Sequence, residues 1–272
     1  MKNIVVIGSS NTDMVVKTSH LPVPGETVLG GDFFMNAGGK GANQAVAAAR
    51  YGNRVVFVAK TGNDLFGEQV RKSMKEDGIV TDYVFIDEEH PSGVALITID
   101  QKAENCIVVA GGANMYLKPE DIDKAKEEIL GGDVVLMQLE TPIETVEYAA
   151  KMAAEAGIKK GIAHITWGHK DPGGVSECGI ARLTRMADTA LENGFLLCLE
   201  NSVFIEHLYA TMEKLKDHPA VRFTYDSGHR NAFAHDFDRS LFKSFNIVHY
   251  SSPPKSKNLI ISSCGFGITS FP

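Results

Sequence analysis

The chain has few of the residues that mark disulfide-rich, nucleic-acid-binding or membrane proteins. Its four cysteines show no CxxC spacing, which favours reduced thiols over a disulfide framework or a zinc site. The net charge is -7, and no basic run is present. Because binding to nucleic-acid phosphates needs clustered Lys and Arg, these features argue against nucleic acid as the main partner.

Long apolar segments are also missing. Runs such as Ile4–Ile7 and Val134–Met137 are far shorter than the roughly 20 residues that span a bilayer. The N-terminus has one lysine and then a short strand-like run, unlike the charged start and long apolar core of a signal peptide. We therefore expect a cytoplasmic protein with no membrane contact. The length of 272 residues is enough for one large domain or two small ones.

What the chain does contain is a glycine-rich stretch around a lysine, from Asn36 to Ala45. Glycine reaches positive φ and lets a ligand come close, and the alanines that follow are strong helix formers. The stretch predicts a turn that opens a helix, whose N–H groups and positive dipole end face whatever lies in the turn. Lys40 adds a charge and Asn43 an amide, which suits a polyhydroxylated or anionic small molecule. A purely structural turn is the alternative interpretation.

Polar residues also follow the first buried strand. The run Asn3–Ile7 ends at Gly8 and predicts a central strand, and Asn11 and Asp13 come shortly after it. Ligands of open α/β sheets bind just beyond the carboxyl ends of strands, so these side chains are candidates for binding sugar hydroxyls. A capped turn is the alternative, since Asn and Asp are common turn residues.

Strands and helices alternate in the rest of the first half, which is typical of α/β architecture. Two β-rich runs, Ser92–Asp100 and Cys106–Ala110, predict a hairpin that stands apart from the main sheet. As a small β lid it would shield a bound substrate from water. Glu140 stands at the end of the buried strand Val134–Leu139, and this position favours a ligand-facing carboxylate over a helix-start charge.

Residues 1–160 contain four motifs: Asn11-Thr12-Asp13-Met14-Val15, Pro24-Gly25-Glu26-Thr27, the stretch Gly38 to Asn43, and Gly62-Asn63-Asp64-Leu65-Phe66-Gly67. Through these motifs the segment resembles the N-terminal half of the ribokinase family of carbohydrate kinases. The resemblance implies a Rossmann-like sheet with a β lid at about 14–37 and 92–112, through which the protein forms a homodimer. The substrate contacts that it implies are Asn11, Asp13, Gly39, Lys40, Asn43 and Glu140.

The implied activity is phosphorylation of D-ribose or a similar sugar at the 5-hydroxyl, with ATP and Mg²⁺. Such a kinase needs a carboxylate base and backbone N–H groups that hold the transferred phosphate. In the family both come from a Gly-x-Gly-Asp motif in the C-terminal half, and this motif is absent here. The ribokinase pattern ends after Lys160, so no catalytic residue and no ATP site are recognisable.

Residues 161–250 contain three short motifs: His164 in His-Ile-Thr, Leu199-Glu200-Asn201, and Tyr225-Asp226-Ser227-Gly228-His229. Through these motifs the segment resembles part of a xylose-isomerase-like TIM barrel from the sugar isomerase/epimerase superfamily. Catalytic groups of such barrels come from the carboxyl ends of strands, and Glu200, Asp226 and His229 would suit a divalent metal. The resemblance implies that Glu200 and Asp226 are metal ligands, and that His164 and His229 are metal or substrate contacts. The alternatives are a helix-start carboxylate for Glu200, a simple turn for Asp226–Gly228 and an ordinary loop histidine for His164.

The expected fold is therefore α/β, a ribokinase-type sheet with a lid joined to a fragment of a (β/α) barrel, with 251–272 as an unassigned tail. The leading hypothesis is a ribokinase-like carbohydrate kinase that binds sugar but is catalytically incomplete. The alternatives are a non-catalytic hybrid or chimeric chain, and a fragment of a metal-dependent sugar isomerase or epimerase.

Overall fold

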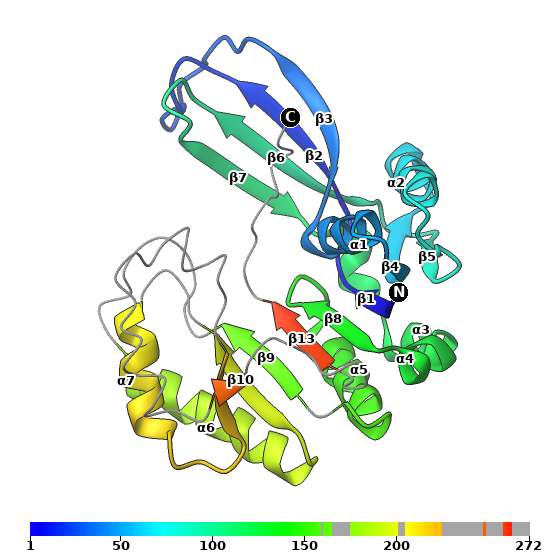
Figure 1. Cartoon of the computed structure of the whole chain (residues 1–272). Coiled ribbons are helices and arrows are strands. Elements are labelled where there is room, and N and C mark those ends of the chain that lie inside the picture. The colour runs from blue at the N-terminus through cyan, green and yellow to red at the C-terminus, as the bar shows by residue number, and fades with distance from the viewer. Residues whose placement is uncertain (159, 165–174, 201–204, 225–246, 249–257, 263–272) are drawn as a thin grey trace. The chain divides into compact units, whose positions relative to one another are not determined.

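The structure is a computed structural model, and the residues it describes are 1–158, 160–164, 175–200, 205–224, 247–248 and 258–262. The chain divides into two compact units (Figure 1). The first contains Met1–Ile129 and Leu136–Ala149. The second contains Leu130–Val135 and, within Ala150–Cys264, the described residues of that range.

Strands and helices alternate along the chain, as the sequence predicts. Up to residue 155 the strands are β1 (Asn3–Ile7), β2 (Asn11–Lys17), β3 (Phe33–Gly38), β4 (Arg54–Gly62), β5 (Val84–Asp87), β6 (Gly93–Ile99), β7 (Asn105–Ala110) and β8 (Val134–Gln138). The helices there are α1 (Lys40–Arg50), α2 (Leu65–Glu76), the 3-10 helix η1 (Gly112–Tyr116), α3 (Pro119–Lys124), α4 (Lys126–Gly131) and α5 (Ile143–Glu155). Later elements are β9 (Lys160–His164), α6 (Glu177–Glu192), β10 (Leu196–Glu200), α7 (Ile205–Leu215), β11 (Val221–Thr224), β12 (Ile247–Val248) and β13 (Asn258–Ser262).

The main sheet of the first unit has the strand order β8-β1-β4-β5. Strand β1 pairs with β4 in parallel, from Asn3 opposite Arg54 to Ile7 opposite Val58. Residues Val55–Ala59 are fully buried, which is why this strand reads as an unbroken apolar run. Helices α1 and α2 pack against the sheet and form one core with it, which includes Val6, Ala45, Phe57, Val70 and Met74.

A separate four-stranded sheet has the order β3-β2-β6-β7, and it extends away from β1 and β4 with α1 at its base (Figure 1). The expected hairpin is present as β6 and β7, which pair antiparallel. Strand β2 lies between β3 and β6, and Asn11 stands in register with Gly38 on one side and Gly93 on the other. The strand that carries Asn11 and Asp13 is thus the centre of this second sheet.

The second unit contains parallel strands in the order β12-β11-β10-β9-β13. Helices α6 and α7 pack on β10 and β11 around a core that includes Ala187, Leu199, Leu208, Met212 and Phe223. The barrel fragment expected here finds no support. Strand β13, from the segment left unassigned, pairs with β9 on the side opposite β10, whereas strands of a barrel follow one another in chain order.

Among the described residues, no helix is long and apolar enough to cross a membrane. The described cysteines Cys106, Cys178 and Cys198 are free thiols.

Candidate functional site

The glycine-rich turn and its helix are present, but the helix begins earlier than the alanine run indicates. Gly39 caps α1 with a φ of 90°, and Lys40 is the first helical residue. A side chain at Gly39 would also collide with the backbone of Ser10 and Asn11, so glycine is required there twice over. Lys40 and Asn43 therefore lie in the first turn of a rigid helix, with Asn43 half-buried.

The start of α1 faces other protein groups as well as any ligand. The N–H of Lys40 donates to Glu140 Oε2 at 3.3 Å, and the N–H of Ala42 donates to the carbonyl of Ser9 at 2.9 Å. A carboxylate at a helix N-terminus is stabilised by the unpaired N–H groups and the dipole. The sequence predicts that these N–H groups face whatever lies in the turn, and in the structure Glu140, which follows β8, accepts from one of them.

Glu140 also joins Lys40 and Ser9 in one polar cluster. Lys40 Nζ lies 2.9 Å from Glu140 Oε1, and Ser9 Oγ donates to Glu140 Oε2 at 2.5 Å. Burial acts to raise the pKa of Glu140, but the hydrogen bonds from Ser9 and Lys40 and the Lys40 charge outweigh it. The net effect is a pKa below the ordinary range, so Glu140 is held ionised.

Asp13 has the opposite electrostatic situation. It lies on β2, and the bare Cα of Gly38 leaves room for its carboxylate, because a Cβ there would overlap both carboxylate oxygens. Burial raises the pKa of Asp13, and the negative charge of Glu140 raises it further. Asp13 is therefore a half-buried carboxylate whose charge is poorly compensated, a group that gains from hydroxyl donors brought by a ligand.

The predicted substrate residues all belong to the first unit. Asn11 and Asp13 are two residues apart on β2 and so project from the same face of the sheet. Gly39, Lys40 and Asn43 form the turn and first helical turn beside it, and Glu140 is tied to Lys40 by the ion pair.

Two residues of this region are missed by sequence reasoning. Ser9 stands out in the sequence only as part of a turn, although its hydroxyl binds Glu140 and its carbonyl accepts from α1. Asn114 is fully buried and bonds to Asn11 across 103 positions. A serine directly after a buried strand is a weak local signal, and no local pattern connects Asn114 to Asn11.

The predicted metal residues are only partly described. Glu200 and His164 stand in register at the ends of β10 and β9, so the backbone brings these two together. Asp226 and His229 lie outside the described residues. Within the described ranges, no group of three or more His, Cys, Asp or Glu side chains could hold a metal ion. The metal site of the second unit stays a prediction.

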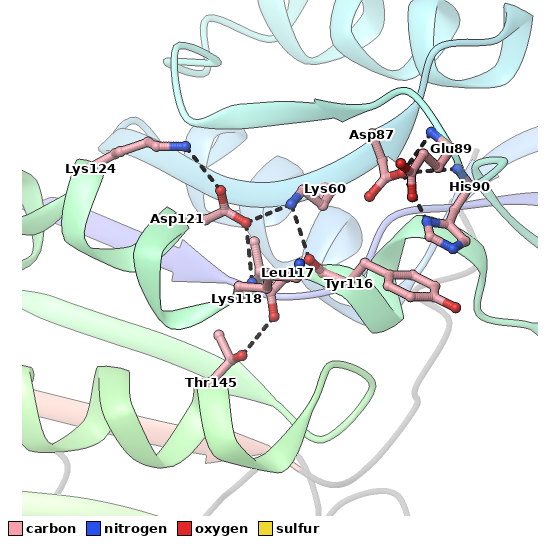
Figure 2. A network of polar contacts seen from close by, with 10 residues as sticks. All are labelled: Lys60, Asp87, Glu89, His90, Tyr116, Leu117, Lys118, Asp121, Lys124 and Thr145. Carbon is pink, nitrogen blue, oxygen red and sulfur yellow. Dashed lines mark hydrogen bonds and ion pairs between the residues drawn. The ribbon is translucent and has the colours of Figure 1, made fainter.

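A second charged cluster lies elsewhere in the first unit (Figure 2). Lys60 Nζ contacts Asp121 Oδ2 at 2.7 Å and the carbonyl of Tyr116 at 3.0 Å. Asp121 also accepts from the backbone N–H of Lys118 and pairs with Lys124 at 3.2 Å. Burial acts to raise the pKa of Asp121, but these donors, with Lys60 foremost, hold it below the ordinary value. The Asp121 carboxylate is thus paired with two lysines.

Comparison with known proteins assigns the chain to a family. The model of the pfkB family of carbohydrate kinases matches residues 1–172, more than half of the chain, so the protein belongs to this family. The chain is 45% identical over 151 residues to ribokinase from Bacillus subtilis, covering 56% of this chain and 51% of that protein. It is 39% identical over 160 residues to deoxyribokinase from Salmonella typhi, covering 58% of this chain and 51% of that one.

The structural similarity reaches further along the chain than the sequence similarity. The structure of Arabidopsis thaliana ribokinase complexed with ribose and ATP superposes with a TM-score of 0.62 at 25% identity, covering 82% of this chain and 72% of that one. Because this superposition covers 82% of the chain, it must include residues after 160. Part of the second unit therefore belongs to a ribokinase-type α/β fold. The chain spans about half the length of the curated relatives named here.

Proposed function

We propose that the first unit binds D-ribose or a similar pentose, as the sugar-binding part of an ATP-dependent kinase acting on the 5-hydroxyl. The observation that carries this proposal is the under-compensated carboxylate of Asp13 beside the Lys40–Glu140 pair. The names of the relatives, ribokinase and deoxyribokinase, support a pentose as the substrate class.

Each residue has a distinct role in this proposal. Asp13 accepts hydrogen bonds from sugar hydroxyls, and such bonds to a charged acceptor are stronger than neutral ones. Lys40 and Asn43 donate from the first turn of α1, where the helix keeps their positions rigid. Glu140 holds Lys40 in place. Gly39 lets the sugar approach the backbone, since it carries no side chain.

The second sheet is proposed to act as a lid and as a homodimer interface. Its strands expose large apolar side chains, with Phe33 60%, Leu96 53% and Val108 61% accessible. A contiguous exposed apolar patch is unusual on a monomer and marks an interaction surface. Analytical ultracentrifugation is expected to show a dimer that Val108→Lys dissociates. A monomer at micromolar concentration would contradict this part of the proposal.

The 272-residue chain by itself is proposed to bind sugar without efficient phosphate transfer. A positioned general base contributes about 10²–10⁴-fold to rate, and the family's Gly-x-Gly-Asp motif is not in this sequence. We assign none of the described residues to ATP or Mg²⁺. A coupled assay of ADP release is expected to show very weak turnover, and normal turnover that depends on Asp13 would overturn this part.

The test of the binding proposal is calorimetric titration with D-ribose. We expect wild type to bind, and we expect Asp13→Ala to bind at least about tenfold more weakly, since bonds to a charged group are worth about 1.5–3 kcal/mol. Asp123→Ala is the matched control, because Asp123 lies on α3 and accepts a hydrogen bond from the exposed Tyr148 hydroxyl. Absence of ribose binding, or equal loss in both variants, would refute the proposal.

A further inference from the structure

Asn114 lies in η1, is 1% exposed, and uses both ends of its side-chain amide. Its Oδ1 accepts from the N–H of Ser10 at 2.8 Å. Its Nδ2 donates to the carbonyls of Ser10 at 3.0 Å and Gly111 at 2.9 Å, and to Asn11 Oδ1 at 2.9 Å. The backbone partners thus fix the orientation of the Asn114 amide. Oδ1 must face the N–H of Ser10, which can only donate, and Nδ2 must face the carbonyls of Ser10 and Gly111, which can only accept.

This fixed amide also decides the orientation of Asn11. Because Nδ2 of Asn114 is a donor, the Asn11 atom that faces it must be the acceptor Oδ1. The Nδ2 of Asn11, with its two N–H groups, is therefore turned away from Asn114. An unconstrained Asn could present either end to a ligand, whereas this one is held in a single orientation.

Glycine on the neighbouring strand makes the contact possible. Gly93 stands in register with Asn11, and a Cβ at Gly93 would overlap both Asn11 Oδ1 and Asn114 Nδ2. Gly93 does not have a positive φ, so glycine is needed here for space and not for an unusual backbone conformation. Gly93 thus gives an independent way to disturb the same amide pair.

We infer that Asn114 is a positioning residue, which holds the Asn11 amide so that the sugar site presents N–H donors beside the Asp13 acceptor. The inference rests on the proposed binding of a sugar by Asn11 and Asp13. The two side chains project from one face of β2, so the site offers a donor next to a charged acceptor. Such a pair selects a ligand with an acceptor oxygen close to a donating hydroxyl, as on adjacent carbons of a pentose.

The isosteric variant Asn114→Asp tests the inference. The new carboxylate can still accept from the Ser10 N–H, but it cannot donate to Asn11, so the Asn11 amide is expected to turn its N–H groups toward that carboxylate and its oxygen toward the ligand. We expect roughly tenfold weaker D-ribose affinity by calorimetry. Asn53→Asp is the matched control, because Asn53 also accepts from a backbone N–H (Lys2) and donates to a backbone carbonyl (Ala48). It should leave the affinity unchanged.

A double-mutant cycle separates positioning from a general structural effect. If Asn114 acts through Asn11, then Asn114→Asp has no further effect on ribose affinity in an Asn11→Ala background. An equal loss in both backgrounds, or full wild-type affinity in Asn114→Asp, would overturn the inference. If wild type binds no ribose, the proposed function fails and this inference fails with it, which is a result distinct from the other two.

Gly93→Ala provides a second variant should Asn114→Asp fold poorly. We expect the added methyl group to separate the two amides and to weaken ribose binding by a similar factor. Gly131→Ala, where a Cβ meets nothing within 4 Å, is the matched control. Affinity in Gly93→Ala equal to that in Gly131→Ala would count against the inference.

Discussion

The two lysine–carboxylate clusters of the first unit use similar residue types but differ in which charge is in excess. In the Lys60–Asp121 cluster the side chains are 12% and 7% exposed, and a second lysine, Lys124, contacts the same carboxylate. In the Lys40–Glu140 cluster the side chains are 21% and 25% exposed, and a second carboxylate, Asp13, lies near the pair.

Under the proposed function, this difference separates a structural cluster from the proposed sugar-binding cluster. Two lysines around one buried carboxylate leave nothing for a ligand to add. Beside the Lys40–Glu140 pair, burial and the negative charge of Glu140 raise the pKa of Asp13, a condition that hydroxyl donors relieve. Perturbed carboxylates of this kind concentrate at functional sites. Substitutions in the two clusters test the contrast, from the largest expected effect to the smallest.

Replacing Lys60 by Met should strongly destabilise the fold. The change leaves Asp121 buried with only the exposed Lys124 as a charged partner, and breaking a buried pair in this way costs about 3–5 kcal/mol. Guanidinium titration measures the free energy of unfolding. Lys40→Met serves as the comparison, because its pair is more open to water and should cost far less. Equal losses in the two variants would remove the distinction between the clusters.

Asp13→Asn should separate binding from stability. Ribose affinity is expected to fall by roughly 10–100-fold, since hydrogen bonds to a charged acceptor are worth about 1.5–3 kcal/mol. The melting temperature at pH 7 should rise, because a pKa raised in the folded state means that ionisation of Asp13 opposes folding. The stabilisation should disappear as the pH falls below the ordinary Asp pKa of 3.8, where the carboxyl is protonated in both states. A lower melting temperature at pH 7 would contradict this account.

Asp121→Asn should show the opposite dependence on pH. The pKa of Asp121 is lowered in the folded state, so its ionised form stabilises the fold above the ordinary pKa of 3.8. The stability difference between wild type and Asp121→Asn should be full at neutral pH. It should decrease as the pH falls through the lowered folded-state pKa. Thermal melts at a series of pH values measure it, and a difference that grows on acidification would refute the assignment.

Ser9→Ala should have the smallest effect. It removes the hydroxyl that donates to Glu140, a loss of about 1 kcal/mol for a partly exposed carboxylate. The pKa of Glu140 should rise, since one of the groups that lower it is gone. Carboxyl titration by carbon-13 NMR measures the shift. Ser176→Ala, which removes a cap from α6, provides a control that should leave Glu140 unchanged.

Local patterns predict several elements of the first unit. The buried run before Gly8, the glycine turn before α1 and the two strands of the hairpin all depend on neighbours a few residues away. The family resemblance of residues 1–160 follows from the same short motifs, and the match to the pfkB family confirms it. The start of α1 at Lys40 is not predicted. Gly39 and Gly41 flank that position, and glycine is typical of a turn, so the sequence places the helix start later, at the alanine run.

Tertiary structure decided which side chains and strands of these elements contact one another. Glu140 contacts the start of α1 across 100 positions, Asn114 holds Asn11 across 103, and β13 joins β9 from a segment without a motif. The sequence by itself indicated polar side chains near strand ends and at a glycine-rich turn, namely Asn11, Asp13, Lys40 and Glu140. The structure places Asn11 and Asp13 within β2 and Lys40 at the first position of α1. The pKa of each carboxylate and the orientation of the Asn11 amide depend on side chains that only folding brings together. These partners are distant in the sequence, so no local pattern predicts them.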